Sequence, residues 1–177
     1  MGLSLPTSNL LYSNPALLPL ISTTASVSVA LFEAIFFNGL VKASRIDKYS
    51  TARTISLWWK STLPESLAVI LGLGLASTIG GIRAVRSYRI GSRERYVAIA
   101  GTLFAVGHFV FGPSIGGVIQ SMSVAYDDLN GIEAKEEGRS EVVDDRVVEL
   151  QNTWLRIHAW RCLLVDGPAL ACFVWLA

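Results

Sequence analysis

The last apolar stretch of the chain, Trp154 to Ala177, combines membrane-spanning length with ionisable side chains. A helix of this length would measure about 36 Å at ~1.5 Å per residue, enough to cross a hydrocarbon core of ~30 Å. The stretch nevertheless contains His158, Arg161 and Asp166. Ionisable groups inside a spanning helix cost a few kcal/mol each and usually face a bundle interior or a water-filled cavity. The stretch therefore predicts both a membrane anchor and part of a polar site.

Three further apolar runs precede this stretch, and most charged residues lie in the segments between the runs. The chain is 51% hydrophobic and 16% charged, whereas a soluble domain carries roughly 25% charged residues. This segregation is typical of a multi-pass membrane protein. We therefore predict an all-α fold, an integral membrane four-helix bundle that forms a single domain over residues 1–177. As its location we expect an endomembrane such as the endoplasmic reticulum. The predicted spans cover about 17–41, 63–82, 96–122 and 154–177.

The segments between the predicted spans differ in charge. Residues 42–62 are predicted to form a polar link with two tryptophans at the membrane interface, and Pro64 is predicted to open the next helix, since proline suits a first helical turn. Residues 83–95 contain five Arg and one Glu. Residues 123–153 contain nine acidic residues. They are predicted to form an acidic, solvated loop whose second half has helical spacing.

Four spans would place both chain termini on one side of the membrane and the segments 42–62 and 123–153 on the other, here called side B. Both 42–62 and 83–95 are rich in Lys or Arg, so the positive-inside rule does not fix the orientation. Residues 1–16 carry no charge and two prolines, which predicts an irregular lead-in. Because a basic signal-peptide region is missing from it, we expect the first apolar run to be a retained helix.

Small residues and one proline predict local features of the middle spans. Gly72, Ala76 and Gly80 recur at a spacing of four, which lets membrane helices approach closely. Pro113 should kink or break the third span, because proline removes a backbone hydrogen bond. Such a break is tolerated at membrane depth where it faces protein or a cavity.

Charge and cysteine usage exclude several classes of function. The formal net charge of +1 provides no basic field for nucleic acid, so no nucleic-acid partner is expected. Cys162 and Cys172 would lie about 15 Å apart along one helix, too far for a disulfide. With two His and two Cys in the chain, no metal-ligand spacing is visible. We expect neither a metal nor an organic cofactor.

Five ionisable residues inside the predicted spans form the candidate site, and they are Glu33, His108, His158, Arg161 and Asp166. At ~1.5 Å per residue, Glu33 lies about 12 Å in from side B, and the last span carries its three groups from side B down to mid-membrane. His108 is near the middle of the third span. We therefore predict that these residues gather in one half of the bundle.

Such a set suits acid–base chemistry. Glu33 and Asp166 would share the roles of general acid and general base, since two carboxylates in different environments can have well-separated pKa values. Arg161 would hold one carboxylate ionised, and His158 or His108 would relay protons. These roles suit the opening of an epoxide, in which the acid protonates the leaving oxygen while the base activates water or a substrate hydroxyl. The alternative is a structural ion-pair network that only locks the helices together.

The last span opens with the pattern W-L-x-x-H-x-x-R, from Trp154 to Arg161, and follows a Gly/Pro-rich third span. This combination resembles the anthrone oxygenase-like family, which are small membrane proteins of fungal polyketide pathways. The resemblance implies oxidation of an anthrone to an anthraquinone without a cofactor. Where the family pattern has a proline about four residues after the arginine, this chain has Val165, and Asp166 is an additional acid. That acid is similar to what is expected of the transmembrane hydrolases of aurovertin- and citreoviridin-type pathways, which are implicated in opening polyketide epoxides to cyclic ethers.

The leading hypothesis is therefore a membrane tailoring enzyme that opens an epoxide in a polyketide, with hydrolysis or cyclisation. Its partners would be a lipophilic small-molecule substrate, the lipid bilayer and other enzymes of the same pathway. The second hypothesis is a cofactor-free monooxygenase, in which His158 deprotonates a phenolic or anthrone substrate whose carbanion then meets dioxygen. The third is a non-catalytic membrane scaffold.

Overall fold

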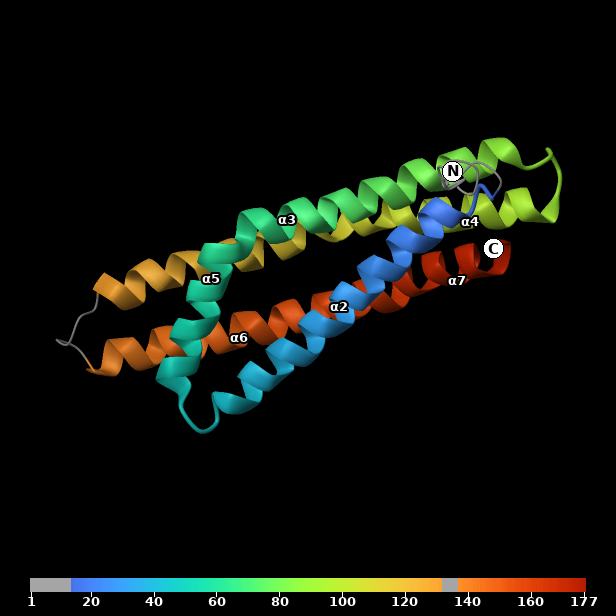
Figure 1. The fold of residues 1–177 in the computed structure, drawn as a ribbon. Helices are drawn as coiled ribbons and strands as arrows, with labels where there is room; N and C mark the ends of the chain where they lie inside the picture. The colour runs from blue at the N-terminus through green and yellow to red at the C-terminus, as the bar shows by residue number, and fades with distance from the viewer. Residues whose placement is uncertain (1–13, 132–136) are drawn as a thin grey trace, which may run out of the picture. The chain divides into compact units, whose positions relative to one another are not determined.

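The chain is all-α over the residues that the computed structural model describes, 14–131 and 137–177 (Figure 1). Most of the predicted lead-in 1–16 lies outside these residues. No strand occurs among them, and two short non-α segments interrupt the helices. The elements in chain order are α2 (Leu17–Ala43), α3 (Lys48–Ser87), α4 (Arg93–Gly107), the 3₁₀ segment η1 (His108–Phe111), α5 (Gly112–Gly131), α6 (Glu137–Arg161), the π-helical segment η2 (Cys162–Asp166) and α7 (Gly167–Leu176).

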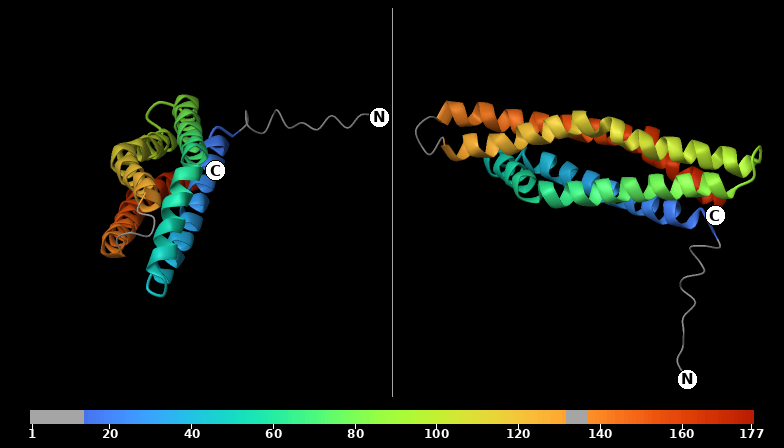
Figure 2. Two further views of the ribbon diagram at one scale, coloured as in Figure 1. Left: turned by 90° about the vertical axis from the view of Figure 1, so that its left-hand side faces the viewer. Right: turned by 90° about the horizontal axis from the view of Figure 1, so that it is seen from above.

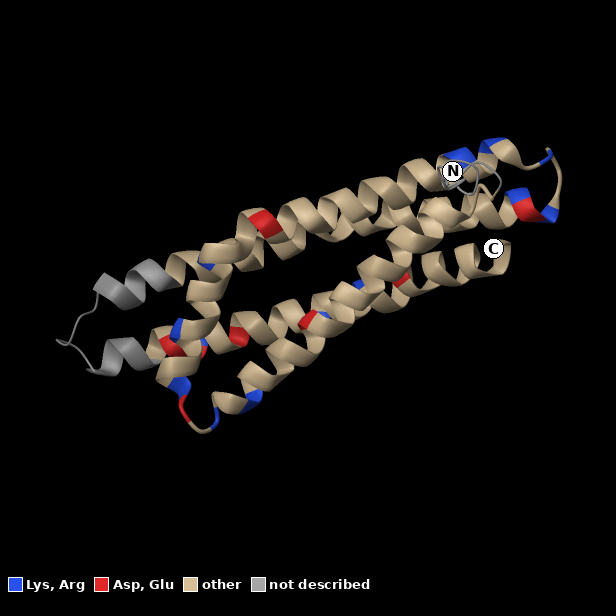
Figure 3. Cartoon of the chain, viewed as in Figure 1, with Lys and Arg blue, Asp and Glu red and all other residues tan. Residues whose placement is uncertain are grey.

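Four helical stretches are long and apolar enough to cross a membrane, and they are Leu17–Ala43, Lys48–Ser87, Arg93–Ala125 and Val142–Leu176. Their most apolar windows have mean hydropathies of 1.4 to 1.8. In the described part of the chain, charged residues are concentrated toward the ends of the helical stretches, and long uncharged stretches lie between them (Figure 3). The prediction of an all-α membrane protein with four spanning helices is confirmed.

The helix α3 is longer than the predicted second span. It begins at Lys48 rather than near residue 63, so most of the predicted polar link is helical and Pro64 lies inside the helix. Arg and Lys are good helix formers, which explains why the charged residues of this segment belong to the helix rather than to a loop before it. Asp47 caps its start by accepting a hydrogen bond from the Ser50 backbone N–H at 3.0 Å. Hydrogen bonds from the Ser50 side chain and backbone lower the pKa of Asp47.

The acidic segment 123–153 is also more helical than predicted. The helix α5 continues to Gly131 and α6 begins at Glu137, while residues 132–136 lie outside the described part of the chain. Glutamate is a good helix former, so an acidic run can extend two helices beyond the bilayer. The predicted helical spacing in the second half of the segment is confirmed by α6.

Two spans are interrupted near their middle. The predicted break in the third span is present as η1, and Pro113 is the second residue of the helix that follows. Proline lacks a backbone N–H and its ring clashes with the carbonyl four residues earlier, here that of Phe109. The interruption η2 in the last span was not predicted. It ends immediately before Gly167 and Pro168, so the same steric reason applies to it.

The described residues pack as two compact units. Unit 1 comprises the residues up to Ser28, Ile70–Phe109 and Cys162–Ala177, and unit 2 comprises Val29–Val69 and Val110–Arg161. Each unit takes segments from four helices. In unit 1, α4 packs along α7, and in unit 2, α5 packs along α6 (Figure 2).

Unit 2 has an aromatic core. Phe37 of α2 stacks on Trp59 of α3 with ring centroids 5.1 Å apart, and Trp154 of α6 meets both rings. The Trp59 indole N–H donates a hydrogen bond to Gln151 Oε1 at 2.9 Å. The two tryptophans of the predicted interfacial stretch are therefore packing residues, because α3 carries them into contact with α2 and, for Trp59, α6.

Unit 1 is held together by close contacts at small residues. A Cβ atom on Gly80 would lie 2.7 Å from Pro19 Cδ, so glycine allows α2 and α3 to approach closely, as predicted. No described atom would lie within 4 Å of a Cβ on Gly72, so the predicted small-residue stripe contributes only in part. The space at Gly101 of α4 is similarly restricted, because a Cβ atom added there would lie 2.9 Å from Cys172 Cβ on α7.

Candidate functional site

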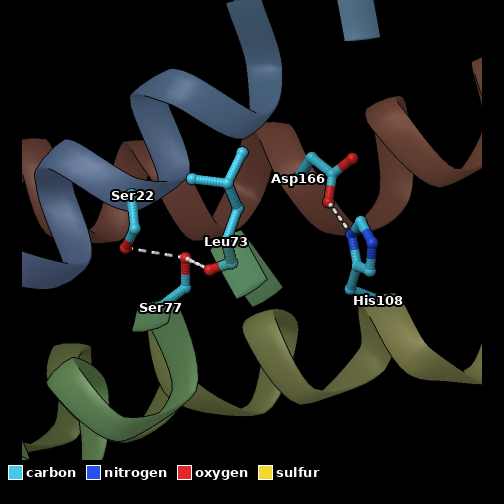
Figure 4. Close-up of polar contacts among 5 residues, drawn as sticks. All are labelled: Ser22, Leu73, Ser77, His108 and Asp166. Carbon is cyan, nitrogen blue, oxygen red and sulfur yellow. Dashed lines mark hydrogen bonds and ion pairs between the residues drawn. The ribbon is translucent and has the colours of Figure 1, made fainter. Parts of the chain in front are cut away.

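Unit 1 contains a buried histidine–carboxylate pair. His108 Nδ1 lies 2.9 Å from Asp166 Oδ1 (Figure 4). The two residues are only 7% and 6% exposed. When the carboxylate is ionised it only accepts hydrogen bonds, so Nδ1–H donates to it. In the neutral ring, Nε2 is then the basic nitrogen, as in the histidine–aspartate half of a hydrolytic triad.

Both members of the pair sit where their helices depart from regular α geometry. His108 is the first residue of η1, and Asp166 is the last residue of η2. A Cβ on Gly167 would lie 3.1 Å from the Cys162 carbonyl oxygen, five residues earlier, which is the spacing of a π turn. Because residues of a regular helix are ~100° apart, a wider turn changes the side that Asp166 faces. A Cβ on Gly107 would lie 3.6 Å from Val165, so α4 and η2 are in contact beside the pair.

A small cavity adjoins this pair within unit 1. The volume available to the centre of a water molecule is about 10 Å³. The cavity therefore has room for about one water. Its lining includes three hydroxyl side chains and both members of the pair: Thr23, Ser26, Gly74, Ser77, Ala105, His108, Asp166 and Ala169. Ser77 Oγ lies 2.9 Å from Ser22 Oγ and 2.9 Å from the Leu73 carbonyl oxygen (Figure 4).

The hydroxyl lining is the part of this site that the sequence analysis missed. In the first span, the hydroxyls of Ser22 and Thr23 donate hydrogen bonds to backbone carbonyls one turn earlier. Thr23 and Ser26 also face the cavity. Their spacing of three places them on one helix face, which is a signal available in the sequence.

Unit 2 contains the other three predicted residues, Glu33, His158 and Arg161, and all three are buried. The guanidinium of Arg161 interacts electrostatically with the Glu33 carboxyl group. His158 Nε2 lies 2.9 Å from the Ala30 carbonyl oxygen, which can only accept, so Nε2 carries a proton. The His158 ring stacks on Trp154 with centroids 4.4 Å apart.

The structure therefore brings the predicted residues together in two sets, one in each unit. The gathering of all five in one half of a bundle stays a prediction. Among the described residues, no group of three or more His, Cys, Asp and Glu side chains is placed to hold a metal ion.

Fold and site define a multi-pass α-helical membrane protein with ionisable pairs inside its spanning helices. Comparison of the chain with known protein families, characterised proteins and solved structures found no match. The resemblance to the anthrone oxygenase-like family therefore depends only on the residues quoted for it, and it stays a prediction.

Proposed function

We propose that this protein is a membrane-embedded enzyme that opens an epoxide in a lipophilic metabolite by acid–base catalysis. The observation that carries the proposal is the buried His108–Asp166 pair, with its 2.9 Å hydrogen bond, beside a cavity that fits one water molecule. A histidine oriented by a carboxylate is a common general base, and a water molecule in the adjacent cavity would be the nucleophile.

The reaction needs no oxidant. Asp166 keeps His108 in the tautomer whose Nε2 is basic, and Nε2 takes a proton from the water as its oxygen attacks an epoxide carbon. The new C–O bond forms while the ring C–O bond breaks, and the resulting alkoxide takes up a proton as His108 releases one. The net change is the addition of one water. In cyclisation a hydroxyl of the substrate replaces the water, and no atom is added.

The cavity is too small for an organic substrate, so the proposal places only the water in it. The epoxide reaches the pair from the lipid, which requires an apolar substrate. Large apolar side chains are exposed on the same helices, among them Leu103 and Leu164, and these surfaces suit a substrate dissolved in the bilayer. The choice of a polyketide as substrate comes from the resemblance described above.

A second candidate function is favoured by His158. Its protonated Nε2 is fixed on the Ala30 carbonyl, so Nδ1 is the basic nitrogen of the neutral ring. That nitrogen suits removal of a proton from a phenol or anthrone, the first step of cofactor-free oxygenation.

Glu33 and Arg161 favour the third candidate, a scaffold, because a buried pair of opposite charges can lock two helices without catalysis.

One assay separates the three candidates. Wild-type protein and the variants Asp166→Asn and His158→Gln are expressed in microsomes, and conversion of a polyene-derived bis-epoxide is measured with and without oxygen. The proposal expects anaerobic conversion by wild type and His158→Gln and its loss in a well-expressed Asp166→Asn variant. Consumption of an anthrone only with oxygen, lost in His158→Gln, would favour the oxygenase. Loss of folded protein in Asp166→Asn, with no turnover by wild type on either substrate, would favour the scaffold.

A further inference from the structure

The arginine-rich segment 83–95 is a feature that the proposed function does not use. It joins α3 to α4 through a tight turn in which Gly91 has φ of +80°, a backbone conformation suited to glycine. The turn makes the two helices antiparallel neighbours. Its five Arg and one Glu therefore concentrate positive charge at one end of this helical hairpin (Figure 3).

A groove of about 350 Å³ runs between the two helices, all within unit 1. Two arginines and a set of mostly apolar side chains line it: Ile82, Val85, Arg86, Arg95, Ile99, Thr102 and Leu103. On α3, Val85 and Arg86 follow Ile82 by three and four residues. On α4, Ile99 follows Arg95 by four residues, and Thr102 and Leu103 follow Ile99 by three and four. Each set therefore lies on one helix face.

The groove has a polar end and an apolar end. Arg86 is next to last in α3 and Arg95 is the third residue of α4, so both lie at the turn. Ile82 and Leu103 lie farther from the turn, and they are 42% and 65% exposed. Exposed aliphatic residues on a spanning helix face lipid. The groove thus has cationic side chains at its mouth, next to the turn, and exposed aliphatic side chains farther from the turn.

Aromatic residues mark the mouth of the groove as the membrane interface. Arg93 lies over the ring of Trp175 at 4.9 Å, and Tyr96 is 64% exposed. Tryptophan and tyrosine concentrate at headgroup level. Arg95 uses one N–H in a 3.5 Å contact to the Tyr88 carbonyl, which leaves other donors of the guanidinium for a ligand.

We infer that this groove binds an anionic phospholipid, with its phosphate at Arg86 and Arg95 and an acyl chain along Ile82, Ile99 and Leu103. Basic pockets between spanning helices are suited to phosphate headgroups, and guanidinium groups bind phosphate in bidentate fashion. Glu94, the one acid of the segment, is not among the groove-lining residues. The groove is distinct from the cavity at His108, with which it shares no lining residue.

Native mass spectrometry of the detergent-purified full chain tests this inference by counting bound lipids during titration with dioleoyl phosphatidylglycerol or dioleoyl phosphatidylcholine. The wild-type protein should bind phosphatidylglycerol at least tenfold more tightly than it binds phosphatidylcholine. Arg86→Gln/Arg95→Gln should weaken that binding about 30-fold, at roughly fivefold per arginine. The matched control Arg89→Gln/Arg93→Gln removes the same charge from the same turn outside the groove, and should weaken it less than threefold.

Two further arms complete the test. Leu103→Trp fills the groove from an exposed position without changing charge, and should weaken phosphatidylglycerol binding even if the arginine variant fails to fold. Inorganic phosphate at millimolar concentration should not displace the lipid. Equal binding of the two lipids, or equal losses in the two double variants, would overturn the inference. So would displacement by phosphate alone, or unchanged binding in Leu103→Trp.

Discussion

At the scale of single residues, unit 1 keeps two ionisable side chains, His108 and Asp166, buried against each other. Removing one partner from a buried pair costs about 3–5 kcal/mol, because the other is left uncompensated. The protein keeps both groups at 7% and 6% exposure, and each lies at a helix irregularity. A π turn inside an α-helix is frequently found at a functional site. These facts together favour a chemical role for the pair over simple packing.

The first prediction concerns the coupling of these two residues. Asp166→Asn keeps the shape of the side chain but no longer supports a protonated His108, so epoxide turnover should fall about 10²- to 10⁴-fold. His108→Gln should cause a similar loss, and the double variant should lose little more, since residues that act as a unit are not additive. Initial rates on equal amounts of folded protein measure this. Multiplicative losses would mean that the two residues act independently.

The second prediction concerns the tight contact between α4 and α7. Gly101→Ala should lower the free energy of unfolding by about 1–3 kcal/mol, because its Cβ would sit 2.9 Å from Cys172 Cβ. Gly39→Ala is the matched control, since no described atom lies within 4 Å of its Cβ. It should leave stability unchanged or slightly higher. Unfolding in mixed micelles compares the two variants. Equal destabilisation of both would contradict the close packing of α4 on α7.

At the scale of elements, the proline positions decide where the spans are interrupted. Pro168 lies two residues after the end of η2, and it prevents the last span from continuing as a regular α-helix. The resulting π turn sets the side of the helix on which Asp166 lies. An irregular element is therefore part of the site.

The third prediction tests this role. Pro168→Ala restores a backbone N–H, so the π turn should regularise and rotate Asp166 by up to ~100° away from His108. Turnover should fall as far as in Asp166→Asn, while thermal stability in detergent stays equal or rises. Pro64→Ala is the control, because that proline lies inside α3 and belongs to unit 2, which does not contain the pair. Full activity in Pro168→Ala would show that the pair does not depend on the interruption.

Sequence reasoning predicted some elements better than others. The four apolar runs predicted the spans, because hydrophobicity over about 20 residues depends little on tertiary packing. Helix ends were less predictable, since Lys, Arg and Glu form helices outside the membrane as readily as loops. Depth counting placed His108 and Asp166 near mid-membrane. Their pairing could not be predicted, because Pro168 indicates that the helix is interrupted but does not indicate a π turn, and it is the type of turn that decides the direction of Asp166.

At the scale of the whole molecule, an even number of spanning helices places both ends of the chain on the same side of the membrane. The fourth prediction is that both termini and residues 88–92 face one side, and residues 44–47 face the other. Glycosylation-site tags inserted at these positions test it in microsomes. Modification of only one terminus would indicate an odd number of spans and contradict the fold as described.

The most direct test of the account follows the oxygen atom that the water supplies. Purified protein converts the bis-epoxide anaerobically in water enriched in oxygen-18, and the hydrolysed product is analysed by mass spectrometry. The account predicts one heavy oxygen per water added, and no such product with His108→Gln at equal amounts of folded protein. Turnover that requires dioxygen, or labelled product at the wild-type rate in His108→Gln, would contradict it.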